Sequence, residues 1–261
     1  YPATEEKQDT IIANQTNGSQ KTKIVDVLGN SASISNFGDL QIGRREPNVS
    51  VQFQYNVATA DCSTTVVGSG TVTQADSMAV VSSGVDATAE AHLESVNSIR
   101  YRPGHSAYAM FSTLYANGGV ATSTQLHGAF SAEDADGFFF GYNSTVFSVG
   151  YAKAGAYTYV AQSAFNHDKL DGTGTSGFTL DTTKLNIYRI SYSWLGAGPI
   201  FYEVYGGSTI GWVLCHIIDF NNTQTTPSIN NPVLKIQMHI IKTAGATNIV
   251  MKSGSWTGGI V

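Results

Sequence analysis

Two acidic, glycine-containing segments carry the residue types that can bind a metal ion. In the first, Asp134 and Asp136 stand at alternate positions before a glycine, and in the second, Asp168 and Asp171 precede a Gly-Thr-Gly run. Such spacing can wrap oxygen ligands around Ca²⁺ where a glycine permits a sharp bend. Both segments lack the closing glutamate of an EF-hand, and Asp/Gly turns between strands are the simpler interpretation. The four aspartates are therefore calcium candidates, and we predict no firm metal site and no cofactor.

Imidazole groups are the next source of catalytic or metal-binding chemistry. The chain has six, at His92, His105, His127, His167, His216 and His239. None forms a His-x-His or His-x-x-x-His pair, and none lies beside a cysteine at zinc-finger spacing. His216 follows Cys215 directly, but adjacent residues on a strand point to opposite faces. The spacing favours structural histidines, and no catalytic residue is predicted.

The motifs of common enzyme classes are also missing. The nearest relative of a nucleophile elbow, Gly68-Ser69-Gly70, lies in a Thr/Val region and indicates a turn. No Gly-x-x-x-x-Gly-Lys-Ser/Thr loop for a nucleotide is present. Paired carboxylates for glycoside hydrolysis stay open, because any two acids can meet across a groove. We predict that the protein is not an enzyme, with a glycan-degrading depolymerase as the less favoured alternative.

Composition excludes two classes of partner. The chain has 261 residues, a net charge of −5 and 13% charged residues, about half of the usual share. Its 14 Lys and Arg are scattered, so nucleic acid is not an expected partner. No apolar stretch approaches the ~20 residues of a membrane helix, so no membrane partner is expected either. The two cysteines, Cys62 and Cys215, are expected to be free and buried.

Short β-type runs separated by turn residues follow one another from Lys23 onward. The run 50–57 alternates polar and apolar residues, which predicts a half-buried strand. Further strands are predicted at 63–74, 77–82, 87–101, 107–115, 123–130, 137–143, 145–152, 157–165, 187–194, 199–205, 211–219, 233–242 and 247–252. No stretch after residue 30 has a sustained helical period. The pattern predicts an all-β fold, an antiparallel β-sandwich resembling a jelly roll, over residues 31–261.

The first 30 residues form a predicted N-terminal arm. Their acidic start favours a short helix, and Thr16-Asn17-Gly18-Ser19-Gln20 favours a linker. Since a lone short helix is marginal in water, we expect the arm to pack on another subunit through Ile11 and Ile12, with a frayed terminus as the alternative. Arg44-Arg45-Glu46-Pro47 interrupts the strand pattern, which leaves open a small separate unit at 31–46.

Aromatic residues are the best clue to a binding surface. Exposed Tyr and Trp rings can stack on sugars or fill a subunit interface. With Phe138, Phe139 and Phe140 in succession, at least one ring must face away from the sandwich interior. We therefore predict a contact between subunits at these three residues.

Seven stretches together resemble a known group of proteins. Near the N-terminus they are Ala3-Thr4-Glu5-Glu6-Lys7-Gln8-Asp9-Thr10-Ile11-Ile12 and Thr22-Lys23-Ile24-Val25-Asp26. Further on they are Ser98-Ile99-Arg100-Tyr101-Arg102-Pro103-Gly104-His105, Asp136-Gly137-Phe138-Phe139-Phe140-Gly141-Tyr142, Leu170-Asp171-Gly172-Thr173-Gly174, Tyr192-Ser193-Trp194-Leu195-Gly196-Ala197-Gly198 and Thr225-Thr226-Pro227-Ser228. The first two resemble segments of tailed-bacteriophage virion proteins. The other five are similar, in order and spacing, to a β-rich domain in structural proteins of phages and large DNA viruses.

This resemblance implies a virion protein on the particle surface. The expected forms are a fibre or spike head, a decoration protein or a minor capsid protein, which acts by assembly and surface presentation. Its expected partners are other copies of itself, as a homotrimer by analogy with fibre heads, and other virion proteins. The alternative is a carbohydrate-binding module that attaches the virus to host surface glycans.

Overall fold

The structure, a computed structural model, describes residues 45–193 and 196–261. This part of the chain contains sixteen strands and one 3-10 helical turn, η1 (Gln162–Ala164). None of its described helical segments could cross a membrane. The predicted arm with Ile11 and Ile12, and nearly all of the unit at 31–46, lie outside the described residues.

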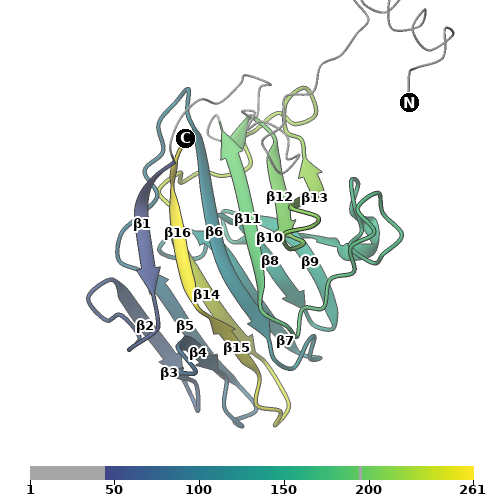
Figure 1. Cartoon of the computed structure of the whole chain (residues 1–261). Coiled ribbons are helices and arrows are strands. Elements are labelled where there is room, and N and C mark those ends of the chain that lie inside the picture. Colours follow the sequence, from purple (N-terminus) through teal and green to yellow (C-terminus); the bar gives the residue numbers. More distant parts are fainter. Residues whose placement is uncertain (1–44, 194–195) are drawn as a thin grey trace, which may run out of the picture. The chain divides into compact units, whose positions relative to one another are not determined.

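One of two antiparallel sheets has nine strands (Figure 1). Its main path runs in the order β13 (Trp212–Ile218), β12 (Ile200–Tyr205), β11 (Asn186–Ser193), β6 (Ser106–Tyr115), β15 (Val250–Ser253), β4 (Met78–Ser82) and β3 (Thr71–Ala75). Two further strands extend it, because β16 (Ser255–Ile260) also pairs with β6, and β1 (Glu46–Gln52) pairs with β16. The long strand β6 therefore has β11 on one side and both β16 and β15 on the other.

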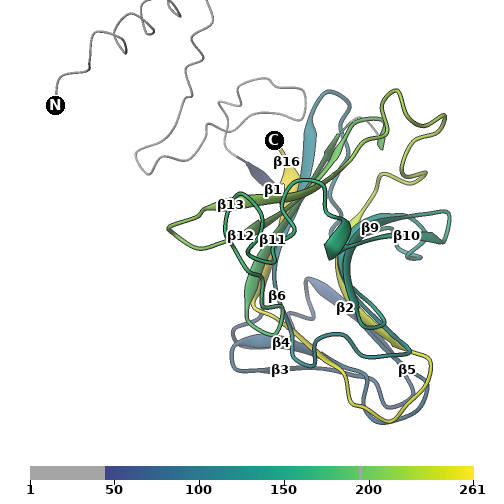
Figure 2. The same ribbon diagram turned by 90° about the vertical axis from the view of Figure 1, so that its right-hand side faces the viewer.

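The second sheet has seven strands. Their order is β10 (Ala156–Ala161), β9 (Val146–Lys153), β8 (Gly137–Asn143), β7 (Ser123–Phe130), β14 (Lys235–Lys242), β5 (Ala89–Ser95) and β2 (Cys62–Val67). Figure 2 shows the two sheets as two layers, with β11, β12 and β13 in one and β5, β9 and β10 in the other. The predicted all-β sandwich is confirmed.

The core lies between the sheets and follows from alternation along each strand. In β5 the odd-numbered residues are buried, whereas Glu90, His92 and Glu94 point to the outer face. Burial of large apolar side chains on the inner faces stabilises the sandwich by about 1.5–3 kcal/mol each. Cys62 and Cys215 are buried and free, as predicted.

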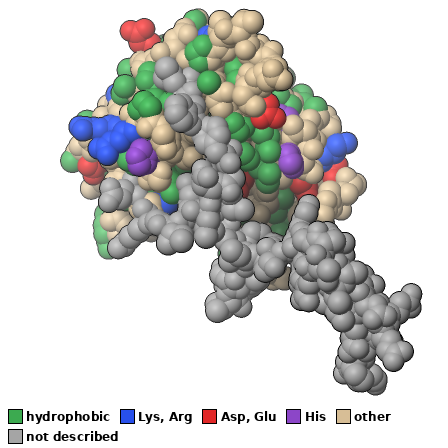
Figure 3. Space-filling view, turned by 90° about the horizontal axis from the view of Figure 1, so that it is seen from above, with side chains coloured by type: hydrophobic (Ala, Val, Ile, Leu, Met, Phe, Trp, Pro, Cys, Tyr) green, Lys and Arg blue, Asp and Glu red, His purple; other side chains and the backbone are tan. Residues whose placement is uncertain are grey.

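The face of the molecule seen from above carries little charge. Seen from above, charged side chains stand in small groups among neutral polar and hydrophobic ones (Figure 3). This distribution agrees with the 13% of charged residues in the sequence.

The three successive phenylalanines are all buried within the chain. Phe138 and Phe140 belong to the main core, whereas Phe139 faces the outer side of the seven-stranded sheet. One ring thus turns away from the interior, as predicted, but Tyr157 and Tyr159 of the same chain pack against it. Because each of the three is 0% exposed in the chain, they offer no free ring for the predicted subunit contact.

Candidate functional site

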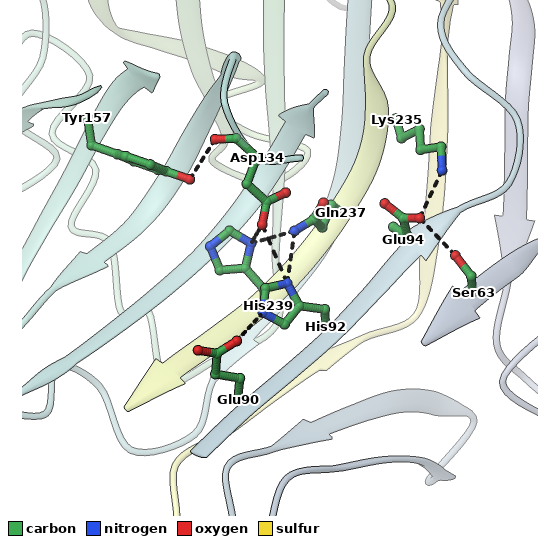
Figure 4. Close-up of polar contacts among 9 residues, drawn as sticks. All are labelled: Ser63, Glu90, His92, Glu94, Asp134, Tyr157, Lys235, Gln237 and His239. Carbon is green, nitrogen blue, oxygen red and sulfur yellow. Dashed lines mark hydrogen bonds and ion pairs between the residues drawn. The ribbon is translucent and has the colours of Figure 1, made fainter. Parts of the chain in front are cut away.

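The outer face of the seven-stranded sheet gathers polar side chains from β5 and β14 (Figure 4). These strands are antiparallel neighbours, and their register pairs Gln237 with Glu94 and His239 with His92. Residues directly opposite each other point to the same face, so the four side chains form two adjacent rows. The rings of His92 and His239 stack with their centroids 5.0 Å apart.

A carboxylate from a neighbouring loop reaches these two histidines. Asp134 lies between β7 and β8, with a left-handed φ of 54°. Its Oδ2 atom is 3.5 Å from Nδ1 of His92 and 4.0 Å from Nδ1 of His239. One ligand atom from each of the three residues lies within 4.8 Å of the others. We call His92, Asp134 and His239 the histidine–aspartate cluster.

The side-chain amide of Gln237 lies within this cluster. Its Nε2 atom is 2.8 Å from Nδ1 of His239 and 3.3 Å from Nδ1 of His92, and it also donates to the carboxylate of Asp134. Its Oε1 atom is buried without a hydrogen-bond partner. The amide nitrogen carries two hydrogens, so it can donate to two of these three neighbours at once, and the tautomers of the two rings decide which.

Burial controls the charge of the cluster. His239 is fully buried, and its loss of hydration, together with the nearby His92, lowers its pKa to about 3. Burial also raises the pKa of Asp134, while the hydrogen bond from Gln237 and the proximity of His92 oppose that rise. At neutral pH, the His239 ring is therefore uncharged.

Two glutamates of β5 flank the cluster. Oε2 of Glu90 lies 3.5 Å from Nε2 of His92, and 43% of the Glu90 side chain is exposed. Oε1 of Glu94 accepts hydrogen bonds from Nζ of Lys235 at 2.8 Å and from the hydroxyl of Ser63 at 2.9 Å. The face therefore offers both hydrogen-bond donors and acceptors beside the cluster.

An aromatic layer covers the same face over β7, β8 and β10. Leu126, Phe130 and Phe139 are fully buried, and the partly exposed rings of Tyr157 and Tyr159 pack against them. The two tyrosine rings stack 6.1 Å apart with 19° between their planes. The hydroxyl of Tyr157 donates to the backbone carbonyl of Asp134 at 2.9 Å, which links the aromatic layer to the cluster.

Glycines make room for this aromatic layer. A Cβ atom on Gly150 would meet the Phe139 ring at 2.8 Å, and one on Gly137 would meet the Phe130 ring at 2.8 Å. Such a Cβ atom would come still closer to the backbone carbonyl oxygen of Thr158 or Ala129, so the close strand pairing and the rings together require glycine at these positions.

The four calcium candidates make separate sets of contacts. Asp134 joins the histidines, whereas Oδ1 of buried Asp136 accepts hydrogen bonds from the backbone N–H groups of residues 230 and 154 at 2.8 and 3.4 Å. The Asp168 carboxylate accepts two backbone hydrogen bonds from its own loop at 2.9 and 3.0 Å, and Asp171 accepts two from Thr173. These contacts are typical of turn-forming aspartates, and calcium binding there stays a prediction.

Sequence spacing does not reveal that His92 and His239 meet. A spacing rule compares residues within one segment, whereas these two come from distant strands. The signal that points to them is alternation, since His92 and His239 both occupy polar positions in the predicted strands 87–101 and 233–242. The pairing of those strands is the missing information.

A groove lies on the outer face of the nine-stranded sheet. Its volume is about 550 Å³, and its lining includes Gln52, Ser112, Ile187 and Thr257. The one charged residue in this lining is Asp61. The groove could hold a small ligand by size, but it brings together fewer polar groups than the outer face of the other sheet.

The sequence matches no protein-family profile and no curated protein. The fold, in contrast, is similar to many solved structures. One was described with the endo-acting O-glycanases that members of the human gut microbiota express to initiate mucin breakdown. Its TM-score is 0.55 at 10% identity, over 82% of this chain and 98% of that chain.

Two further neighbours show the same architecture. An endo-1,3-β-glucanase from Streptomyces sioyaensis has a TM-score of 0.54 at 9% identity, over 83% of this chain and 98% of that one. The carbohydrate recognition domain of Emp47p has a TM-score of 0.50 at 9% identity, over 84% and 97% of the two chains. At such low identities these similarities define the fold alone, which is a lectin-like β-sandwich.

Proposed function

We propose that the protein binds a carbohydrate on the outer face of the seven-stranded sheet. The observation that carries the proposal is the pair of stacked, partly exposed tyrosines beside the polar groups of β5 and β14. Sugar rings pack their C–H faces on aromatic rings, and their hydroxyls bond to carboxylates, imidazoles and amides. Tyr157 and Tyr159 supply the first kind of contact, and Glu90 and His92 supply the second.

The fold supports this proposal. Among the similar structures are a carbohydrate recognition domain, an endo-1,3-β-glucanase and a structure described with O-glycanases. The same sandwich therefore carries carbohydrate recognition in other proteins, although the fold by itself does not assign a ligand.

We further propose that glycan binding serves a virus particle in attaching to its host. This step is based on the resemblance of the quoted sequence segments to virion proteins. In this interpretation the sandwich is a fibre or spike head, a decoration protein or a minor capsid protein, and the N-terminal arm connects it to the particle.

Binding without cleavage is the proposed activity. Glu90 and Glu94 lie four residues apart on one face of β5, so their Cα atoms are separated by roughly 13 Å. Glycosidases hold two carboxyl groups about 5–10 Å apart, and one of them must donate a proton. Lys235 and Ser63 both hydrogen-bond to Oε1 of Glu94. The third carboxylate of this face, Asp134, accepts a hydrogen bond from Gln237 and contacts His92.

A glycan array, followed by titration calorimetry with the strongest oligosaccharide, tests the proposal. Tyr159→Ala should weaken binding at least tenfold, about 1.4 kcal/mol, because it removes a stacking surface. The matched control is Tyr55→Ala, since Tyr55 is 84% exposed and lies in the loop between β1 and β2. Equal affinity of the two variants would contradict the assignment of this face. If the protein releases new reducing ends from the oligosaccharide, binding without cleavage is contradicted.

A further inference from the structure

We propose that His92, His239 and Asp134 bind a divalent transition-metal ion, and that zinc suits this donor set. The ion would share His92 and Glu90 with the proposed glycan-binding face, but its binding is tested without a glycan. Two imidazole nitrogens and one carboxylate oxygen are ligands that Zn²⁺ binds readily, whereas Ca²⁺ prefers oxygen ligands alone. The donor set thus differs from the calcium sites considered for the aspartate loops.

The distances within the cluster are close to those of a metal site. With metal–ligand bonds of about 2.0–2.2 Å, neighbouring ligand atoms in a tetrahedral site lie about 3.4 Å apart. The carboxylate of Asp134 lies 3.5 Å from the ligand nitrogen of His92 and 4.0 Å from that of His239. Small side-chain adjustments would bring the three atoms to a common ion.

Hydrogen bonding within the cluster is incomplete without a cation. Three acceptors, the Nδ1 atoms of His92 and His239 and the carboxylate of Asp134, surround the Nε2 atom of Gln237. That amide nitrogen carries two hydrogens, so one acceptor stays unsatisfied. One metal ion accepts all three lone pairs at once.

Gln237 provides a second, independent sign of a ligand. Its side chain is almost fully buried, and its Oε1 atom has no hydrogen-bond partner. Leaving a buried oxygen without a partner destabilises the fold. Rotation of the amide turns this oxygen toward the cluster, where it becomes a fourth ligand to the ion.

The protonation of both rings suits metal binding. The Nδ1 atoms of both rings face the Gln237 amide inside the cluster, and a metal ion there would bind both Nδ1 lone pairs, which places the ring protons on Nε2. Oε2 of Glu90 lies 3.5 Å from Nε2 of His92 without a hydrogen bond, and a small side-chain shift would let it accept that ring proton, as carboxylates do beside metal-binding histidines. Glu90 is therefore a positioning residue for the site.

A bound ion would fasten the β7–β8 loop to the sheet. The two histidines come from neighbouring strands, whereas Asp134 comes from the loop and holds a left-handed φ. The backbone carbonyl of Asp134 also accepts a hydrogen bond from the hydroxyl of Tyr157. The ion would thus link three parts of this face that are distant in the sequence.

Titration of the full chain with metal salts tests the site. Protein treated with EDTA and dialysed is titrated with ZnCl₂ in a calorimeter and with CoCl₂ while visible absorption is recorded. We expect one Zn²⁺ ion to bind per chain. Bound Co²⁺ should show the visible absorption of a four- or five-coordinate site and should be displaced by Zn²⁺. CaCl₂ should not compete with either ion. Absence of saturable Zn²⁺ binding by the folded chain would overturn the proposal.

Variants locate the ion. His92→Ala and Asp134→Asn should weaken Zn²⁺ binding at least about a hundredfold, and Glu90→Gln about tenfold. His105→Ala is the control, because His105 is exposed and its ring hydrogen-bonds to the backbone carbonyl of Val261, away from the cluster. His92 is partly exposed, so its variant is expected to fold, which near-UV circular dichroism checks. Unchanged affinity in folded His92→Ala, or an equal loss in His105→Ala, would place the ion elsewhere.

Discussion

Histidines take different roles in this protein according to the face on which the strand register puts them. His239 lies on the outer face of β14, within the histidine–aspartate cluster. His127 on β7 lies in the core, where its ring stacks on Phe111 with centroids 3.9 Å apart. Its Nδ1 atom bonds to the hydroxyl of Thr113 at 2.5 Å, and its Nε2 atom is buried without a partner.

Burial of His127 predicts a loss of stability in mild acid. Loss of hydration, with a smaller effect of His239, lowers the pKa of His127 well below its ordinary value of 6.5. Below pH 6.5, His127 therefore binds a proton in the unfolded chain but not in the folded chain. The contribution of the neutral His127 ring to the unfolding free energy is complete above pH 6.5. Below pH 6.5 it falls by up to about 1.4 kcal/mol per pH unit.

A double variant tests this origin of the acid sensitivity. His127→Phe with Thr113→Val removes the titrating ring and its hydroxyl partner together. The unfolding free energy of each protein is measured with urea, in the presence of EDTA, at pH 6.5 and at pH 5.0. The decrease between the two pH values should be about 2 kcal/mol smaller in the double variant than in the original chain. Equal losses in the two proteins would mean that His127 does not titrate on unfolding as described.

Residue types along the sequence identify only part of the candidate site. Asp134 is a metal candidate from sequence because of its acidic, glycine-containing loop. Its actual neighbours, His92 and His239, lie on strands that are distant in the sequence, and local spacing contains no information about their register. The aromatic prediction also needs the structure, since Tyr157 and Tyr159 are partly exposed while Phe138 to Phe140 are buried.

Strands are predictable where turn residues bound them on both sides. The predicted strands 123–130 and 137–143 have the same bounds as β7 and β8. The run 63–74 is predicted as one strand, but Gly68, with a φ of 63°, and Gly70 form a turn that sends β2 and β3 into different sheets. The glycines indicate a turn at this point, but their spacing does not show that the chain changes sheets there.

Two further strands differ from the prediction for identifiable reasons. β1 starts at Glu46 and includes Pro47, which is tolerated because β1 pairs on one side alone, with β16. β16 is not predicted, because Gly258 and Gly259 weaken its β-type pattern. Gly258 is required by packing, since a Cβ atom there would meet Ile99 at 2.7 Å.

Close packing between β7 and β8 predicts a severe effect of one methyl group. Gly141 in β8 has a φ of 153°, and a Cβ atom there would collide with the carbonyl of Gln125 and lie 2.9 Å from Cα of Leu126. Gly141→Ala should cost more than about 3 kcal/mol of unfolding free energy. The matched control is Gly155→Ala, at a φ of 79° with no atom within 4 Å, which should cost about 1 kcal/mol. Chemical denaturation measures both, and similar costs would contradict the collision.

At the scale of the whole molecule, two outer faces of the sandwich are available for contacts. The seven-stranded sheet presents the tyrosines and the histidine–aspartate cluster, and the nine-stranded sheet presents the groove near Gln52 and Thr257. The sparse charge seen in Figure 3 leaves neutral polar groups to cover much of the surface. Such a surface suits contacts with neutral sugars or with other subunits.

The predicted homotrimer can be tested by mass. Light scattering of the full chain should give three times the 27.7 kDa of one chain. The same chain without residues 1–30 should show loss of assembly, because the arm is predicted to carry the subunit contact. A monomer in both samples would contradict the trimer and leave the glycan-binding domain as a single unit.

Hydroxyl-radical footprinting with and without the bound oligosaccharide tests the proposed glycan-binding face most directly. The partly exposed Tyr157 and Tyr159 should become protected from oxidation, together with His92. Met110, which lines the groove on the other sheet, and the exposed Tyr55 should react as before. Protection of Met110 with no change at the tyrosines would move the carbohydrate to the nine-stranded sheet and contradict glycan binding by the seven-stranded one.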